Sequence, residues 1–472
     1  MIKRFLPFVV FGLFLTLISS VHAVDYDYFG VVWSKTAGDH HFGLVIDNGY
    51  LYTSDYNGLF CINIETGETK WCIKTEFEPY NAVFRNVDNN PKLTKTTISF
   101  ITTMGIYGYD KATGKQKWFV SCKPKSDLSN PVNNISIINF FDKICLIDLE
   151  KGTFIRTIPL KDSVGQDRIV FRNKNFAVFV NYTHIVILDL VNNDIFLSEL
   201  LPEPCHFKPV PLFDGNMLYY YSRKDKQVMV NCYDLVKRTI VWSQNIDFQS
   251  NMLISGNKLV AGKVCLDKNN GKILWKNDQI DFSSVNCLCD DRITAFLDNG
   301  DYVIFKLDTG EITCKDTRLE ELGDDRSISS FPIYHKGNIY MTTGSAIYKF
   351  GANVSTVSVT VGSNYSLVGK QKVFIDDKPF VKNGALYINP VTIIEPLGGR
   401  VGGFSTKQYK NCIYNDKVVR LLKTKSDSKD NNVIDGCIEV NNTIFVPLRK
   451  LTDAFNLKLK WDTKTKTATI TK

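Results

Sequence analysis

Histidine is scarce in this chain, with six in 472 residues, and neither a Cys-Cys pair nor a C-x-x-C-H motif occurs. The missing C-x-x-C-H motif excludes a c-type haem attachment. No set of cysteine, histidine and carboxylate residues has zinc-like spacing, and adjacent strand residues such as His40 and His41 point to opposite faces. We therefore predict no metal site and name no catalytic residue.

Dense runs of lysine and arginine are also absent, although the formal net charge is +8. The basic residues are scattered and do not alternate with aromatic residues, which argues against a nucleic-acid partner. We interpret the surplus as a solvated surface, which still permits weak attraction to an anionic cell envelope.

Long apolar runs are missing except at the N-terminus, where the run Leu6 to Ile18 is short for a membrane span. Lys3 and Arg4 precede it, and Val21-His22-Ala23 follows it. This order is typical of a secretory signal peptide over residues 1–23, with an uncleaved anchor as the alternative. No cysteine lies near the cleavage point, so we expect no bacterial lipid anchor. We predict a secreted or cell-surface protein with no transmembrane segment after cleavage.

One short pattern recurs along most of the chain. It has a β-forming segment, an Asp or Asn, a turn that usually contains Gly, and a second β-forming segment that often ends in Trp. The seven copies are CINIETGETKW (61–71), GYDKATGKQKW (108–118), LIDLEKGTFIR (146–156), ILDLVNNDIFL (187–197), CYDLVKRTIVW (232–242), CLDKNNGKILW (265–275) and KLDTGEITC (306–314).

The Asp and Asn residues of these copies anchor the expected turns. Their spacing averages about 41 residues, which is in the range of four-stranded propeller blades. Asx and Gly residues accept the backbone conformations of a tight hairpin, so each anchor is explained by its own turn and not by a shared calcium site. The anchors are Asn63, Asp110, Asp148, Asp189, Asp234, Asp267 and Asp308.

Two half-copies stand at the ends of this region. Gly344 to Phe350 matches the strand before the turn, and Phe29 to Trp33 matches the strand after it. Pairing them gives one more blade, closed by strands from both ends of the region, and such closure removes an exposed sheet edge. We predict an all-β propeller of eight blades over residues 24–351 and a small α+β domain over residues 352–472.

The repeats resemble the pyrroloquinoline-quinone (PQQ) type of propeller repeat over residues 25 to 351. The matches with the most shared positions run from Asp110 through Gly114 to Trp118 and from Asp267 through Gly271 to Trp275. Quinone enzymes with this repeat carry a vicinal Cys-Cys disulfide over the cofactor and a calcium ion. This chain has only Cys287-Leu288-Cys289, whose two thiols face opposite sides of a strand. The resemblance therefore implies a fold and not a chemistry.

The last 120 residues contain a different duplication. Ala385 to Val391 and Asn442 to Arg449 are its two strand copies, and Pro390 and Pro447 each open a short helix, where a missing N–H costs nothing. Leu448, Leu451 and Phe455 are spaced for one helix face, and Thr465 to Thr471 alternates as a strand. The segment resembles the copper amine oxidase N-terminal-like domain, an accessory domain that does not hold the copper.

Tryptophan and cysteine mark further repeat positions. One Trp per repeat favours packing between blades over a sugar-stacking platform. Cys61, Cys232 and Cys265 share one repeat position and are expected to be small buried residues. Cys412 and Cys437 are candidates for a disulfide that would contribute about 3 kcal/mol. The repeated tryptophans are Trp33, Trp71, Trp118, Trp242 and Trp275.

Three functions fit these observations. The first is an exported, non-enzymatic propeller that binds a protein or a cell-envelope polymer through its loops, with the C-terminal domain as a surface-associated accessory module. The second is a PQQ- or small-molecule-dependent oxidoreductase that uses the propeller channel, with the quinone and calcium as cofactors. The third is a bacterial cell-wall polysaccharide-binding protein. We favour the first and expect no bound cofactor.

Overall fold

The computed structural model describes the chain from residue 30 to residue 472, apart from segments within that range. The segments not described are 37–41, 56–57, 75–90, 103, 124–127, 141–142, 160–167, 173–174, 181–183, 193, 201–210, 225–226, 248–251, 280–284, 290, 297–301, 317–331, 337, 343–345, 352–353, 403–408, 415–416, 423–431 and 442. The predicted signal peptide, the His40-His41 pair and Gly344-Ser345 therefore lie outside the described residues.

Strands β2 to β28 form seven antiparallel sheets of consecutive strands. The first four sheets contain β2 (Phe42–Asp47), β3 (Tyr50–Asp55), β4 (Gly58–Asn63) and β5 (Thr69–Lys74); β6 (Lys92–Leu93), β7 (Thr97–Thr102), β8 (Gly105–Asp110) and β9 (Gln116–Ser121); β10 (Ile135–Asn139), β11 (Lys143–Asp148) and β12 (Thr153–Pro159); and β13 (Arg168–Arg172), β14 (Phe176–Val180), β15 (His184–Asp189) and β16 (Asp194–Leu200). The next three contain β17 (Leu212–Asp214), β18 (Met217–Lys224), β19 (Gln227–Asp234) and β20 (Thr239–Ile246); β21 (Met252–Ser255), β22 (Lys258–Ala261), β23 (Val264–Asp267) and β24 (Ile273–Lys276); and β25 (Val285–Cys289), β26 (Arg292–Phe296), β27 (Tyr302–Lys306) and β28 (Ile312–Asp316).

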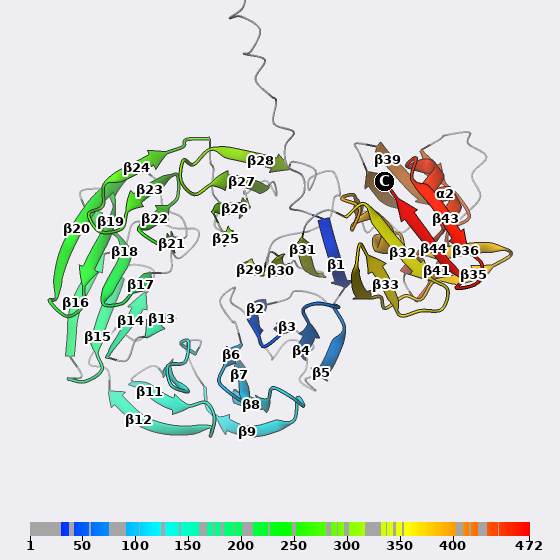
Figure 1. Ribbon diagram of the computed structural model, residues 1–472. Coiled ribbons are helices and arrows are strands. Elements are labelled where there is room, and N and C mark those ends of the chain that lie inside the picture. The colour runs from blue at the N-terminus through cyan, green and yellow to red at the C-terminus, as the bar shows by residue number, and fades with distance from the viewer. Residues whose placement is uncertain are drawn as a thin grey trace, which may run out of the picture.

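A further sheet joins the two ends of this region. It contains β29 (Ile333–His335), β30 (Asn338–Thr342) and β31 (Ala346–Gly351), with β1 (Gly30–Thr36) paired antiparallel to β31. In this pairing Trp33 lies opposite Lys349, and Lys35 lies opposite Ile347. The predicted pairing of the Trp33 stretch with the Ile347 stretch is therefore confirmed. Figure 1 shows the sheets arranged as a ring, with β1 and β31 side by side.

The burial of the strands in one sheet shows how neighbouring sheets of the ring pack against each other. In the β6–β9 sheet, β7 and β8 are buried on both faces, whereas the outer strand β9 alternates between half-buried and exposed residues. The inner strands are covered on both faces because neighbouring sheets pack against them. Tyr52 and Leu59 of the β2–β5 sheet, for example, share one core with Ile98 and Tyr107 of the next sheet.

The β10–β12 sheet has three strands where its neighbours have four. The segment before β10 contains Pro131, which has no N–H to give to a strand ladder. Ser129 lies in this segment, and its backbone N–H still donates to Ile137 O at 3.0 Å. The segment thus follows the sheet without forming a regular fourth strand.

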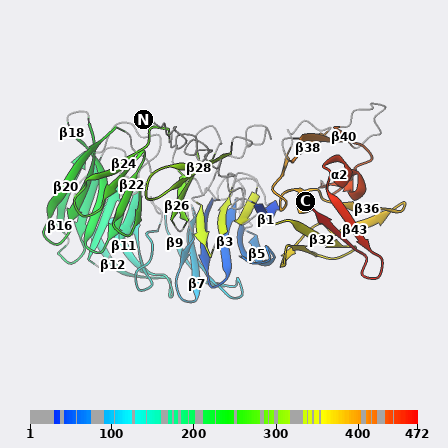
Figure 2. The ribbon, with the colours of Figure 1, turned by 45° about the horizontal axis from the view of Figure 1, so that its top comes forward.

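The C-terminal region forms three more sheets beside the ring (Figure 2). They contain β34 (Gln371–Phe374), β33 (Tyr365–Val368), β32 (Thr356–Thr360), β44 (Thr467–Thr471) and β43 (Lys458–Asp462); β35 (Phe380–Lys382), β36 (Ala385–Ile388), β42 (Thr443–Pro447) and β41 (Ile438–Val440); and β37 (Arg400–Gly402), β38 (Tyr409–Tyr414), β39 (Lys417–Leu422) and β40 (Val433–Ile434).

Two short helices connect these sheets, α1 (Val391–Ile394) and α2 (Leu448–Ala454), and each begins directly after a proline. The expected start of each helix at Pro390 or Pro447 is confirmed. Leu448, Leu451 and Phe455 are all buried in one core, as their spacing predicts. Neither described helix is long and apolar enough to span a membrane.

Candidate functional site

The turn anchors of the repeats act locally. Asp110 Oδ1 accepts the N–H groups of Ala112 at 3.1 Å and Thr113 at 2.9 Å. The Thr113 hydroxyl also donates to Asp110 Oδ1, at 2.8 Å, and this bond is the main cause that lowers the pKa of Asp110 below its usual value, with the two N–H bonds adding to it. The same two-bond pattern occurs at Asn63, Asp148, Asp189, Asp234 and Asp267. Each carboxylate or amide is therefore occupied by its own turn.

The seventh predicted anchor, Asp308, requires a correction. Where the turn contains a glycine, the anchor lies four residues before it and its carbonyl accepts that glycine's N–H, as at Asn63, Asp110, Asp148 and Asp267. In the last copy Gly310 N donates to Lys306 O at 2.9 Å, so Lys306 and not Asp308 occupies the anchor position. The prediction followed residue type, whereas the backbone register follows the distance to the glycine. Asp308 instead pairs with Lys258 of the preceding sheet.

Each repeated tryptophan packs onto the turn of the next sheet. A Cβ built on Gly271 would lie 2.6 Å from Trp242 Cε3, and one built on Gly114 would lie 2.9 Å from Trp71 Cδ2. The indole N–H then donates to the carbonyl one residue after the anchor. These bonds are Trp33 to Ile64 at 3.2 Å, Trp71 to Lys111 at 3.1 Å, Trp242 to Lys268 at 3.0 Å and Trp275 to Leu307 at 2.9 Å.

Two positions depart from this pattern. Trp118 stacks on Gly152, but its buried Nε1 has no hydrogen-bond partner among the described residues. In the next copy Arg156 stands at the tryptophan position, and its Nη1 donates to Leu190 O at 2.8 Å. Arg156 thus supplies the same donor to the carbonyl one residue after Asp189.

The tryptophans do not form a shared surface. They lie between successive pairs of sheets, and Trp33, Trp242 and Trp275 are each less than 10% exposed. This arrangement is that of packing residues, because a sugar-stacking platform needs exposed rings on one surface.

The cysteines of the shared repeat position lie in three separate cores. Cys61, Cys232 and Cys265 are all buried, and burial raises the pKa of Cys265 to about 12. Cys72 is exposed on β5, where it lies opposite Phe60, while Cys61 lies opposite Trp71.

Cys412 and Cys437, the candidate disulfide, require a correction. Both side chains are buried thiols of the C-terminal core, and no disulfide joins them in the structure. The Cys437 thiol instead donates to Ile434 O at 3.4 Å, and burial raises its pKa to about 12. The physical reason is that this core accommodates both residues as small apolar side chains.

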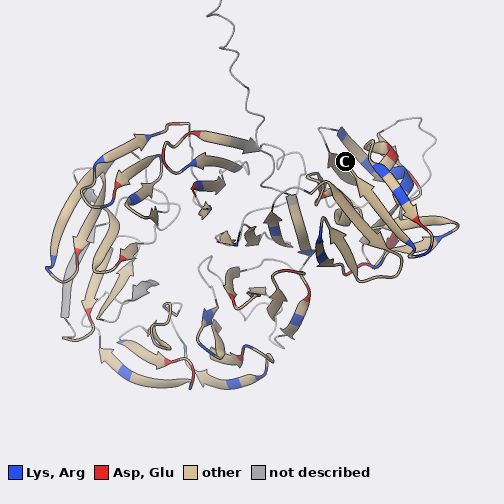
Figure 3. Cartoon of the chain, viewed as in Figure 1, with Lys and Arg blue, Asp and Glu red and all other residues tan. Residues whose placement is uncertain are grey.

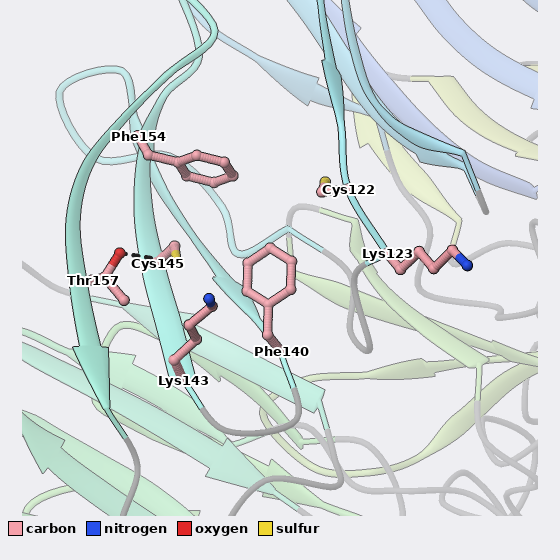
Figure 4. Close-up of a pocket in the computed structure, with 7 residues that line it drawn as sticks. All are labelled: Cys122, Lys123, Phe140, Lys143, Cys145, Phe154 and Thr157. Atoms are coloured by element: carbon pink, nitrogen blue, oxygen red, sulfur yellow. Dashed lines mark hydrogen bonds between the residues drawn. The ribbon is translucent and has the colours of Figure 1, made fainter.

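A surface pocket of about 450 Å³ lies between the β6–β9 and β10–β12 sheets (Figure 4). Phe140, directly after β10, and Phe154 on β12 direct their rings into it, with centroids 6.2 Å apart in an edge-to-face arrangement. Cys122, directly after β9, faces them from the opposite wall. The pocket therefore offers an apolar, aromatic floor.

An ammonium group lies beside this floor, since Lys143 Nζ is 5.8 Å from the centroid of the Phe140 ring. Lys123, two residues after β9, also lines the pocket, but its side chain extends away from the two rings (Figure 4). No acidic residue is among the described lining residues. The arrangement fits a ligand with an apolar group and an adjacent negative charge.

Two thiols are also among the lining groups. The Cys145 thiol is buried and lies 3.4 Å from the Thr157 hydroxyl. Burial, followed by the neighbouring Cys145, raises the pKa of Cys122 to about 11, so this thiol stays protonated at neutral pH. No group of three His, Cys, Asp or Glu side chains among the described residues is placed to hold a metal ion.

Comparison with known protein families identifies the repeats and the C-terminal segment. A PQQ-repeat model, described as outer membrane protein assembly factor BamB, matches residues 19–244, and a model of the copper amine oxidase N-terminal domain matches residues 429–472. The chain contains PQQ-like repeats. Both resemblances seen in the sequence are thus confirmed.

Solved structures support the same fold. BamB from Moraxella catarrhalis superposes with a TM-score of 0.52 and 10% sequence identity. The alignment covers 68% of this chain and 99% of the BamB chain. The computationally designed Ika8 protein has a TM-score of 0.51 and 11% identity, with the same two coverages. At these identities the likeness shows the fold, a β-propeller. No curated protein matched the sequence.

The PQQ-like repeat did not reveal the pocket. The lining of the pocket comes from two strands and two connections, and only Phe154 falls inside a repeat copy. One signal was present in the sequence. Phe154 and Ile155 take up two successive residues of a strand, so at least one of them faces away from the core. In the structure both are exposed, at 43% and 54%.

Proposed function

We propose that this chain is an exported, non-enzymatic scaffold of the cell envelope, built on an eight-bladed propeller that binds a partner protein. Three observations support the proposal: the ring of sheets closed by β1 and β31, the match to the BamB family model and the signal-like N-terminus. The role of that family, described as an outer membrane protein assembly factor, is the basis for the envelope assignment.

The proposed binding role rests mainly on the pocket of Phe140, Phe154 and Lys143. Its aromatic floor would accept one bulky apolar side chain, and Lys143 would pair with a neighbouring carboxylate. We assign it to an extended peptide segment in which an acidic residue adjoins a large apolar residue.

The position of the pocket favours an extended peptide. Strand β12 is the edge of its sheet, since among the described strands it pairs only with β11. An edge strand presents unpaired backbone groups to which an extended segment adds, while its side chains fill adjacent pockets. The exposed Phe154 and Ile155 of β12 provide apolar contacts for such a segment.

Fluorescence anisotropy of the mature chain with short labelled peptides tests this role. Peptides that combine Asp or Glu with Phe or Leu are compared with the same peptides carrying Lys in place of the acids. We expect preferential binding of the acidic peptides, a loss of tenfold or more in Phe154→Ala and Lys143→Glu, and a smaller loss in Lys123→Glu. Lys151→Glu is the control, because Lys151 is 75% exposed on the same sheet and outside the pocket.

Equal binding of acidic and basic peptides would contradict the pocket assignment, as would unchanged affinity in Lys143→Glu. The propeller assignment has its own test, since small-angle scattering of the mature chain should match a ring beside a compact C-terminal region.

A further inference from the structure

The C-terminal region is attached to the ring through the first repeat. Phe374 N donates to Thr66 O at 2.7 Å, and the Tyr365 hydroxyl donates to Glu68 Oε2 at 3.0 Å. Thr66 and Glu68 belong to the turn between β4 and β5, and Tyr365 and Phe374 belong to β33 and β34. This contact joins two parts of the chain separated by about 300 residues.

Apolar side chains continue the contact below these hydrogen bonds. Val32 and Trp33 of β1 share one buried cluster with Val368 of β33 and Val373 of β34. All four are less than 7% exposed. The ring and the C-terminal region therefore share a small hydrophobic core. Residues from both parts can line a cavity beside this core.

A cavity of about 280 Å³ lies at this junction, lined by β1, β33, β34 and the α1 segment. Its volume corresponds to that of roughly nine water molecules in the liquid. Glu395, directly after α1, lines the cavity and is only 2% exposed. Ser34 Oγ donates to Glu395 Oε2 at 3.2 Å, which ties this carboxyl group to the propeller strand.

Two further carboxyl groups line the cavity. Asp376 pairs with Lys35 at 3.3 Å, and Asp377 accepts a hydrogen bond from Asn389 Nδ2 at 3.0 Å. With Glu395, the described lining residues thus include three carboxyl groups and one ammonium group. Such an excess of carboxyl groups favours a cationic occupant.

Ser366 is the second, independent sign of a ligand. Its side chain on β33 lines the cavity and is 2% exposed, yet its Oγ has no hydrogen-bond partner among the described residues. A buried hydroxyl without a partner costs free energy, and beside a cavity a bound molecule can supply that partner. A donor on a bound ligand would supply the missing partner.

We propose that this junction cavity binds a small organic ammonium ion. The ammonium N–H groups would donate to the Glu395 carboxylate and to Ser366 Oγ, and the attached carbon chain would lie against Val368 and Val373. A metal ion is a weaker candidate, because no described group of three His, Cys, Asp or Glu side chains is placed to coordinate one. The proposal does not depend on the peptide pocket, which lies on other sheets.

Titration calorimetry of the full mature chain with 1,4-diaminobutane and with butylamine tests the proposal, with 1-butanol as the uncharged isostere. We expect the amines to bind with one site per chain and the alcohol to show no binding. Glu395→Gln keeps the shape of the side chain and removes its charge, so it should lower amine affinity tenfold or more. Ser366→Ala should lower affinity by a smaller factor.

Ser99→Ala is the matched control. Ser99 on β7 is also fully buried and also has an Oγ without a hydrogen-bond partner among the described residues, but it lies outside this cavity. Its replacement should leave amine affinity unchanged. Thermal unfolding of each variant verifies that it folds, and if Glu395→Gln does not, Ser366→Ala and 1-butanol still decide the matter. No amine binding by the wild-type chain, or equal binding by Ser366→Ala, would overturn the proposal.

Discussion

The indole ring of Trp275 lies directly against Gly310, the turn glycine of the next repeat. A Cβ added to Gly310 would lie 2.6 Å from Trp275 Cε3, closer than real side chains approach. Trp275 also donates its N–H to Leu307 O in the same turn. The same paired contact joins Trp33, Trp71 and Trp242 to the turn of the following repeat.

Replacing Gly310 by alanine should therefore destabilise the protein by about 2–4 kcal/mol. The change adds a clash with Trp275 to the cost of a side chain at the φ of +69°. Gly215→Ala is the control, because Gly215 has φ of +59° and no atom near its added Cβ, so only the backbone cost of about 1–2 kcal/mol applies. Urea unfolding measures both, and equal losses would show that the packing against Trp275 does not matter.

The two tryptophans Trp118 and Trp275 allow the hydrogen bond to be separated from packing. Trp275→Phe removes the donor to Leu307 O, whereas Trp118→Phe removes an N–H that has no partner among the described residues. We expect Trp275→Phe to be more destabilising by about 1–2 kcal/mol. The comparison is made by chemical denaturation under one set of conditions, and a larger loss in Trp118→Phe would contradict this account.

Glu150 connects the β10–β12 sheet to the preceding one. Burial alone would raise its pKa, but hydrogen bonds from Thr94, Thr96 and Thr97 outweigh that effect and hold the pKa well below its usual value. A carboxyl group with a lowered folded-state pKa stabilises the protein above its unfolded-state pKa and loses this contribution as the pH falls.

Glu150→Gln should therefore lower the free energy of unfolding by about 1–3 kcal/mol at neutral pH. The difference from wild type should shrink as the pH falls below about 4.3, the usual pKa of a glutamate, because the unfolded wild-type chain then binds a proton that the folded chain does not. Glu311→Gln is the control, since Glu311 is 63% exposed beside Lys306. A difference that is constant from pH 7 to pH 3 would rule out the proposed role of the charge.

The cysteines should differ in reactivity according to burial. In the folded protein we expect iodoacetamide to modify the exposed Cys72 and to leave the buried Cys412 and Cys437 unmodified. The raised pKa of Cys437, about 12, keeps its thiol protonated at pH 8. Mass spectrometry of labelled peptides, with and without denaturant, measures this. If Cys437 reacted only after reduction, a disulfide would be present after all.

The repeat unit itself was predictable from the sequence. A turn anchored by Asp110 or Asp267 depends on hydrogen bonds to residues two and three positions later, so its chemistry is contained in five consecutive residues. The pairing of the Trp33 stretch with the Ile347 stretch was also predictable, because two half-copies at opposite ends have only each other as complements. The assignment of Asp308 failed because residue type and turn register disagree there.

The pocket and the junction cavity could not be predicted before the tertiary structure was known. Phe140, Phe154 and Lys143 meet at their pocket because β10, β11 and β12 lie side by side, and Glu395 meets Ser34 because the C-terminal region packs on the first repeat. Neither set of contacts repeats along the chain, so no periodic sequence pattern predicts it. The sequence by itself determined the local turns and the closed ring, since those follow from backbone hydrogen bonding and apolar burial. The positions of the pocket and the cavity depend on how separate elements pack, which only the folded chain specifies.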